Sequence, residues 1–199
     1  MPFNHNDHYH PLLLRHVPAH ARTALDVGCG TGKFARRLAT AGLTVEAIDA
    51  HAGVLEAARA LSPGEITFRE QDVTRAELPE GGYDFISCLA SLHHVPFDTV
   101  TRLRRALTPG GVLAVLGLAK PSSAPYLAKW LAATPANLAA RLAVAAGERL
   151  NGGPDVPLAP PIQDWTTTTR EVRRRSAQLL PGSTMRPLLF WRYLLVYRN

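Results

Sequence analysis

The sequence predicts an α/β fold of the Rossmann-like, doubly wound type, and three observations predict it. Short apolar runs alternate with segments of helical spacing between residues 23 and 118. A glycine-rich turn follows the first apolar run, and an aspartate lies at the end of each of the first three runs. Because strands that alternate with helices favour parallel pairing through right-handed crossovers, we expect one mostly parallel sheet with helices on both faces.

Composition places the chain among globular proteins. Its 199 residues suit one domain, 1–199, and 46% of them are hydrophobic, which excludes general disorder. The formal net charge is +6. A basic surface can attract nucleic acid, but apart from a run at 170–175 the basic residues are scattered, so nucleic acid is not the favoured partner.

The remaining bulk features point to a cytoplasmic protein. The two cysteines, Cys29 and Cys88, form no CxxC pair and are expected to be free thiols in a reducing compartment. Residues 1–5 lack the pattern of a secretory signal, and no apolar run reaches the ~18 residues of a membrane span. No cysteine and histidine spacing indicates a metal site.

The regular part of the chain yields the following expected elements. Strands are expected at 23–27, 44–49, 66–71, 83–88 and 112–118. Helices are expected at 33–41, 52–61 and 97–107, and the turn Pro109-Gly110-Gly111 is expected to separate the last helix from the last strand.

Residues 119–165 interrupt this pattern and are predicted to be a helical lid insert. Two helices are expected there, at 126–133 and 135–150, with Pro135 at a helix start, where its missing N–H costs nothing. A proline-rich link, 154–164, follows. Inserts beside the carboxyl edge of a sheet often cover a ligand.

After the insert the regular pattern resumes. Thr168 to Glu171 has the spacing of a capping box and predicts a helix that stops at Pro181-Gly182. The segment from Met185 to Tyr197 predicts two strands with a turn near Phe190.

The string from Ala24 to Gly32, ALDVGCGTG, carries the chemistry. Glycines at alternate positions allow a tight turn and a close backbone approach to a ligand, and the following helix start favours an anion. A nucleotide P-loop is excluded because Phe34 follows Lys33. A dinucleotide fingerprint fits Gly28 and Gly30 but finds Lys33 at its third glycine position.

The DxGxGxG spacing instead resembles the first motif of class I S-adenosylmethionine-dependent methyltransferases. Asp49 ends the second expected strand, 19 residues after Gly30, where a carboxylate can accept hydrogen bonds from ribose hydroxyls. Further matches are Gln71-Asp72-Val73 and the strings 83–95 and 107–113, which look like the quinone-biosynthesis branch and its small-molecule relatives. The matched motifs span about residues 23–118.

This resemblance implies a seven-stranded mixed sheet in the order 3-2-1-4-5-7-6 and assigns roles to residues. It places the loop Gly28-Cys29-Gly30 against the methionine part of S-adenosyl-L-methionine. Asp49 would hold the ribose with Ala50 beside the adenine, Asp72 and Val73 would hold the adenine edge, and Leu89 would lie near the sulfonium. Asp26 is expected to brace the glycine loop rather than to touch the ligand.

Three side chains remain with two interpretations each. His93 and His94 are either a general base near the methyl acceptor or a packing pair at a helix entrance. Tyr9 is either an aromatic contact of a segment that closes the cofactor pocket or part of a frayed terminus.

The leading functional hypothesis is methyl transfer to O, N or C of a small organic acceptor in secondary metabolism, with S-adenosyl-L-homocysteine as product and a monomer or homodimer as the active form. Three alternatives stay open. The same fold can bind the cofactor and catalyse a cyclisation, rearrangement or elimination. The basic charge permits an RNA methyltransferase, which should show steep salt dependence. A non-catalytic sensor of the cofactor is the third.

Overall fold

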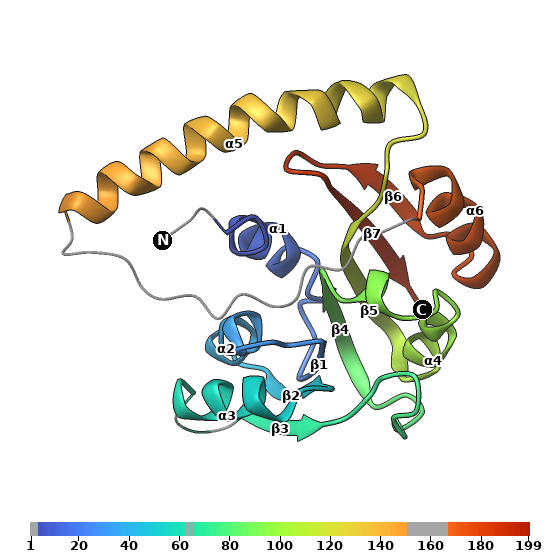
Figure 1. Cartoon of the computed structure of the whole chain (residues 1–199). Helices are drawn as coiled ribbons and strands as arrows, with labels where there is room; N and C mark the ends of the chain where they lie inside the picture. The colour runs from blue at the N-terminus through green and yellow to red at the C-terminus, as the bar shows by residue number, and fades with distance from the viewer. Residues whose placement is uncertain (1–3, 63, 65, 151–166) are drawn as a thin grey trace.

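The predicted sheet is confirmed in the computed structural model, which describes residues 4–62, 64, 66–150 and 167–199 (Figure 1). Among these residues seven strands form one sheet in the order β3-β2-β1-β4-β5-β7-β6. The strands are β1 (Thr23–Val27), β2 (Thr44–Asp49), β3 (Ile66–Glu70), β4 (Tyr83–Leu89), β5 (Leu107–Leu118), β6 (Thr184–Pro187) and β7 (Arg192–Arg198).

The strand pairing brings the carboxyl ends of the central strands level. β1 to β5 pair in parallel, with Val27 opposite both Ile48 and Cys88. β7 runs antiparallel between β5 and β6, so Arg192 at its start lies opposite Leu118 at the end of β5. The glycine-rich turn after β1 and the motifs at the ends of β2, β3 and β4 therefore meet at one edge of the sheet.

Helices cover both faces of the sheet, as Figure 1 shows. They are η1 (Asp7–Tyr9), α1 (His10–Leu14), α2 (Lys33–Thr40), α3 (Ala52–Ala60), η2 (Leu92–His94), α4 (Thr99–Arg105), α5 (Ala124–Leu150) and α6 (Thr169–Leu179).

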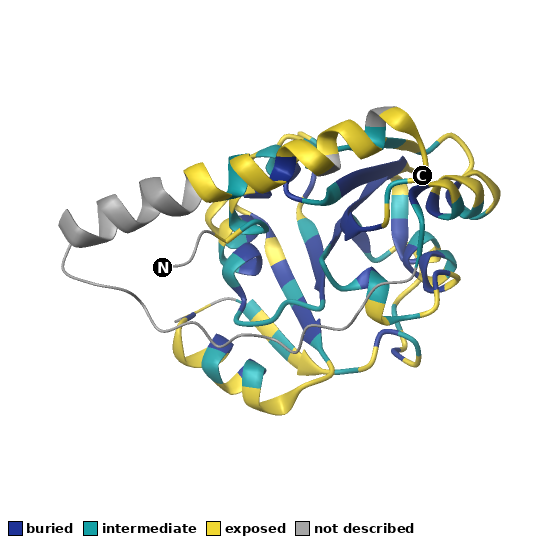
Figure 2. Cartoon of the chain, turned by 45° about the horizontal axis from the view of Figure 1, so that its top comes forward, coloured by how far each residue is buried: buried dark blue, intermediate teal, exposed yellow. Residues whose placement is uncertain are grey.

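The described residues form a hydrophobic cluster on each face. One cluster includes Leu103 of α4 and Val172 of α6, and the other includes Leu13 of α1 and Leu38 of α2. Figure 2 shows buried residues concentrated on the central strands. Strands that are buried on both faces have continuous apolar sequences, and this is why the central strands could be predicted from the sequence.

The expected turn at 109–111 does not separate a helix from a strand, because these residues lie within β5. β5 starts at Leu107, five residues before the expected strand, and α4 is shorter than the expected helix. The pairing register jumps, however, because Tyr83 faces Leu107 whereas Phe85 faces Val112. The Pro-Gly-Gly residues form an irregularity within the strand pairing, and this explains why the sequence there read as a turn.

The expected break at Pro135 is wrong. Residues 124–150 form one helix, α5, with Pro135 inside it. A proline in a helix interior removes one hydrogen bond and costs about 3 kcal/mol. The flanking sequence is rich in alanine and leucine, the strongest helix formers, and Ala133 and Ala136 on either side of the proline are buried or partly buried. Propensity and packing together outweigh the local cost.

The two ends of the predicted insert are joined to each other. Lys120 and Thr168 form a parallel bridge, in which the Lys120 N–H donates to Thr167 and the Thr169 N–H donates to Lys120. Beyond this junction, Lys129 Nζ of α5 donates to the Pro187 carbonyl oxygen at 3.2 Å, and Asn137 Oδ1 contacts His5 Nε2 at 2.8 Å. α5 therefore lies over the β6–β7 hairpin and the N-terminal segment. The expected link at 154–164 falls outside the described residues.

The predicted cap of α6 is confirmed, because Thr168 Oγ1 accepts from the Glu171 N–H at 3.2 Å. We expect Thr168→Ala to lower the free energy of unfolding by about 1 kcal/mol, since one N–H of the first turn loses its acceptor. Urea denaturation measures this, with Thr167→Ala as the matched control. Equal losses in the two variants would contradict the capping role.

No helix in the described ranges is both long enough and apolar enough to cross a lipid bilayer.

Candidate cofactor and acceptor site

The glycine loop leaves β1 in a turn that is fixed from the neighbouring strand. The N–H groups of Gly28 and Cys29 both donate to the carbonyl oxygen of Ile48, at 2.8 and 3.1 Å. Gly28 and Gly30 have φ values of +67° and +54°, a region that favours glycine. The loop is thus held against the tip of β2, beside Asp49.

Gly28 and Gly30 differ in what surrounds them. A Cβ atom on Gly28 would lie 2.3 Å from Ser91 Cβ, so this glycine is required by packing within the protein. A Cβ atom on Gly30 would meet no described atom within 4 Å. The open side of the loop is therefore at Gly30, where a ligand can approach bare backbone.

Asp26 lies in β1, two residues before Gly28, and is buried. Its Oδ1 accepts from Ser87 Oγ at 2.7 Å, and Ser87 itself lies on β4. Burial raises the pKa of Asp26 to about 6, against the opposing effects of the hydrogen bonds from Ser87 and from the backbone of Ala35. The carboxylate thus ties β1 to β4 and to the start of α2.

Asp49 lies at the tip of β2 in direct contact with the open part of the loop. Its Oδ2 accepts from the Gly30 N–H at 3.0 Å, and its Oδ1 accepts from the His51 N–H at 3.1 Å. The side chain is 13% exposed, which leaves part of the carboxylate accessible. His51 Nδ1 also lies 3.1 Å from Oδ1. Because a carboxylate has about four acceptor positions, capacity remains for a ligand hydroxyl. Ala50 follows it and is exposed.

Asp72 lies in the turn after β3. Its Oδ1 accepts from both the backbone N–H and the hydroxyl of Thr74, each at 2.8 Å, and this backbone bond is the largest cause of a lowered pKa for its exposed carboxyl. Val73 is buried beside it. Asp72 thus has a structural role in its turn, while its Oδ2 has no hydrogen bond from the described residues.

Gln71 is a polar group that the sequence interpretation did not assign. Its N–H donates to the Asp49 carbonyl oxygen at 2.9 Å, so it lies against the tip of β2. Its Oε1 is buried and accepts no hydrogen bond from the described residues. A buried acceptor of this kind is costly unless a partner satisfies it. Only the motif match to the neighbouring Asp72 indicated this part of the chain.

The end of β4 packs against the glycine loop through Ser91. Ser91 Oγ donates to the Val27 carbonyl oxygen at 2.8 Å and lies 2.9 Å from Cys88 Sγ. Leu89 is the last residue of β4 and is partly exposed, and Ala90 after it has φ +52°. This sharp turn keeps Leu89 at the sheet edge.

His93 and His94 follow in η2 with ring centroids 3.9 Å apart. His94 is exposed, whereas His93 lines a cavity of about 220 Å³ together with Phe97, Val172 and Tyr193. Burial, His94 and Arg192 together lower the pKa of His93 to about 4, so its imidazole is neutral at pH 7. The pair therefore presents one side chain to solvent and one to this partly open pocket.

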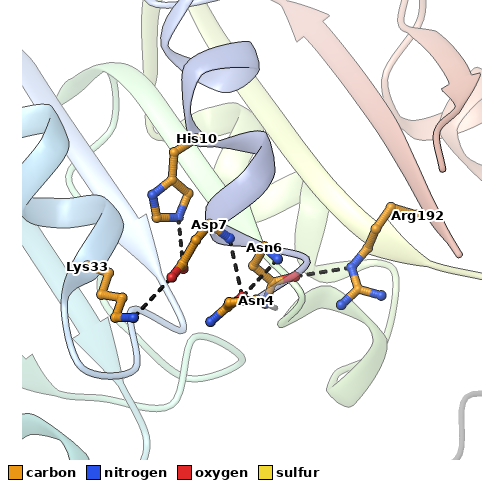
Figure 3. A network of polar contacts seen from close by, with 6 residues as sticks. All are labelled: Asn4, Asn6, Asp7, His10, Lys33 and Arg192. Atoms are coloured by element: carbon orange, nitrogen blue, oxygen red, sulfur yellow. Dashed lines mark hydrogen bonds and ion pairs between the residues drawn. The ribbon is translucent and has the colours of Figure 1, made fainter. Parts of the chain in front are cut away.

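Tyr9 is not part of a frayed terminus, because it is buried and its hydroxyl donates to the Leu189 carbonyl oxygen at 2.9 Å. The segment around it bridges two parts of the fold (Figure 3). Asp7 forms an ion pair with Lys33 of α2 at 3.0 Å, and Asn6 Oδ1 accepts from Arg192 Nε of β7 at 3.1 Å. The N-terminal segment thus lies beside the start of α2, next to the glycine loop.

The two thiols are poor nucleophiles as they stand. Burial is the main cause that raises the pKa of Cys29 above its usual range, and it raises the pKa of Cys88 to about 12. No group of three or more potential metal ligands occurs within the described ranges.

Comparison with known proteins decides the family. A family model described as a methyltransferase domain matches residues 25–115. An uncharacterized methyltransferase of Mycobacterium bovis is 37% identical over 99% of this chain and 97% of its own length. The chain belongs to the class I S-adenosylmethionine-dependent methyltransferases. S-adenosyl-L-methionine is the methyl donor of this family, and the resemblance seen in the motifs is confirmed.

The methyltransferase is also related to small-molecule enzymes. It is 39% identical to the ubiquinone biosynthesis O-methyltransferase of Nitrosococcus oceani over 51% of this chain and 47% of that protein, so it spans about half the length of this relative. A crystal structure of a Pyrococcus horikoshii protein shares the fold, with a TM-score of 0.68, 16% identity, and coverage of 97% of this chain and 88% of that one. The [4+2]-cyclase SpnF has a TM-score of 0.53 and 27% identity over 59% of this chain and 46% of its own.

The residues of the methyltransferase fit the family's cofactor. Gly30 has open space on its side-chain face, Asp49 beside it has acceptor capacity to spare, and the buried Gln71 Oε1 has no described donor. These three features lie along adjoining strand tips and match a ligand with a polar chain, a diol and an amino group.

Proposed function

We propose that this methyltransferase moves the methyl group of S-adenosyl-L-methionine to an O, N or C atom of a small organic acceptor, in secondary metabolism. The observation that carries the proposal is the contact between Gly30 and Asp49, which sets open backbone beside an accessible carboxylate. We also propose that residues 1–199 form a single domain in which 119–165 covers the acceptor.

The proposed roles follow from position. Gly28, Cys29 and Gly30 hold the methionine end, Asp49 accepts from the ribose hydroxyls, and Ala50 lies beside the base. Asp72, Val73 and the added Gln71 hold the adenine edge. Leu89 lies near the sulfonium, and Tyr9 acts indirectly by holding the N-terminal segment over the loop. The bound cofactor supplies a methyl group already activated on sulfur, so alignment is the main task of the protein.

The volume of the cavity beside His93 suits a methyl acceptor the size of one substituted aromatic ring. Its volume is about 220 Å³, compared with about 150 Å³ for a cavity that binds benzene. Because His93 is neutral at pH 7, its imidazole can accept a hydrogen bond from an acceptor hydroxyl and orient it. With a pKa of about 4 it is a weak base, so we assign it orientation first and proton acceptance second. His94 is the weaker candidate for both roles because its side chain is exposed.

The test of the cofactor site is Asp49→Ala. We expect its affinity for S-adenosyl-L-homocysteine to fall by at least ~1 kcal/mol, since hydrogen bonds to a charged group are lost. Isothermal titration calorimetry measures this, with Glu56→Ala, an exposed acid on α3, as the matched control. Unchanged affinity in Asp49→Ala would remove the ribose assignment, and no binding by the wild type would contradict the proposed function.

A second function, cofactor-dependent cyclisation without methyl transfer, is favoured by the 27% identity to SpnF. Mass spectrometry of a turnover mixture separates the two. S-adenosyl-L-homocysteine formed in step with product supports methyl transfer, and unchanged cofactor beside a rearranged product supports cyclisation.

A further inference from the structure

Arg192 is a partly buried cation whose neighbours are neutral. Its Nε donates to Asn6 Oδ1 at 3.1 Å, and its Nη1 donates to the Phe190 carbonyl oxygen at 3.2 Å. Figure 3 shows the Asn6 contact, with the two terminal nitrogens of the guanidinium beyond it. Nη2 donates to no atom among the described residues.

Two arginines in the described part of the chain form ion pairs with described carboxylates. Arg69 lies 3.4 Å from Glu46, and Arg175 lies 2.8 Å from Asp98. Arg192 forms no ion pair with any described carboxylate, and burial lowers its pKa to about 10. A half-buried guanidinium that donates only to neutral acceptors has no compensating charge from the described residues, and its fork of donors matches a carboxylate.

The position of Arg192 is in the acceptor half of the site. Leu118, its partner on β5, lies two residues beyond Leu116, which faces Leu89 at the tip of β4. The charge of Arg192 acts on both His93 and Tyr9. Arg192 thus stands past β4, on the side of the sheet edge away from the glycine loop and Asp49.

We propose that Arg192 binds an anionic group, a carboxylate, on the methyl acceptor. This rests on the proposed function and names the acceptor class: an organic acid whose carboxylate is held at the start of β7 while its nucleophilic atom faces the cofactor. Nη2 and the second proton of Nη1 supply the two donors. A hollow of about 10 Å³ beside Arg192, bordered by Tyr126, holds one water at most.

The experiment titrates protein loaded with S-adenosyl-L-homocysteine with benzoate, phenylacetate and octanoate, and with the primary amide of each, by calorimetry. We expect at least one acid to bind wild type about tenfold more tightly than its amide. Arg192→Met should abolish this preference and Arg192→Lys should keep part of it. Arg186→Met, which removes an exposed arginine from neighbouring β6, should leave it unchanged.

Two results would overturn the proposal: no acid preferred over its amide by wild type, or a preference that survives in Arg192→Met. Thermal denaturation of each variant shows whether it is folded, and Arg192→Lys keeps the test usable if Arg192→Met is not. S-adenosyl-L-homocysteine binding by wild type is recorded separately. Its absence contradicts the proposed function and this proposal together, whereas its presence without acid preference contradicts this proposal alone.

Discussion

Gly28→Ala is expected to lower the free energy of unfolding by about 2 to 5 kcal/mol. The left-handed backbone at φ +67° costs an alanine roughly 1 to 2 kcal/mol, and overpacking in a tight site adds about 1 to 3. The added methyl would lie 2.3 Å from Ser91 Cβ, an atom next to the backbone that cannot move aside cheaply. Ser91 also donates to Val27, so its displacement would disturb β1 itself. Urea denaturation followed by circular dichroism measures the loss.

Gly30→Ala is the matched control, because its φ is also positive while its added methyl meets no described atom. We expect it to lose only the backbone part, roughly 1 to 2 kcal/mol. Its affinity for S-adenosyl-L-homocysteine should fall at least about tenfold, since the methyl occupies the ligand's side of the loop. The same stability loss in both variants would show that packing against Ser91 is unimportant, and full affinity in Gly30→Ala would place the ligand elsewhere.

Asp26→Asn is expected to change how stability depends on pH. Burial raises the pKa of Asp26 from its ordinary 3.8 to about 6, so between these values the folded protein binds the proton more tightly than the unfolded chain does. The contribution of Asp26 to stability is therefore largest at acid pH and declines as pH rises through 4 to 6. The free energy of unfolding of Asp26→Asn, relative to wild type, should increase by roughly 2 to 3 kcal/mol from pH 4 to pH 7.

His93 acts in the opposite direction, which makes the two side chains separable. Its pKa is lowered from 6.5 to about 4, so the unfolded chain binds the proton more tightly and stability is lost as pH falls through this range. In wild type the two slopes oppose each other. The free energy of unfolding of His93→Asn should therefore decline as pH rises, because of Asp26. That of Asp26→Asn should increase as pH rises, because of His93. Denaturation at several pH values, with Glu56→Gln as control, measures both. A constant difference between Asp26→Asn and wild type would contradict the raised pKa.

The order and type of the elements could be predicted where local and tertiary preferences agree. β1 and β4 are apolar runs between turn residues, and α6 begins at a capping sequence that the structure uses. The errors lie where the two conflict. At Pro135 helix formers and packing overrule a local breaker, and at Pro109 pairing with β4 carries a strand through a turn sequence. Neither the continuous helix nor the extended strand can be predicted from a short stretch of sequence, because both depend on contacts with distant residues.

The acidic strand ends of the site were predictable, and their partners were not. Asp26 and Asp49 were found because each follows an apolar run, a pattern that needs no three-dimensional information. Ser91, Gln71 and Arg192 matter through contacts with residues far along the chain. Ser87 offered one signal, a hydroxyl in an apolar strand that must find a partner, and its partner is Asp26.

The bridge between Lys120 and Thr168 has a consequence for replacing the segment between them. Adjacent strands lie about 4.8 Å apart, so the two points at which this segment joins the rest of the fold are neighbours. A substitute segment of another length or composition can be exchanged there without altering the register of any strand. The match to the family model ends at residue 115, just before the junction between Lys120 and Thr168. Under the proposed roles, replacing this segment would change the acceptor side of the site and leave the residues assigned to the donor in place.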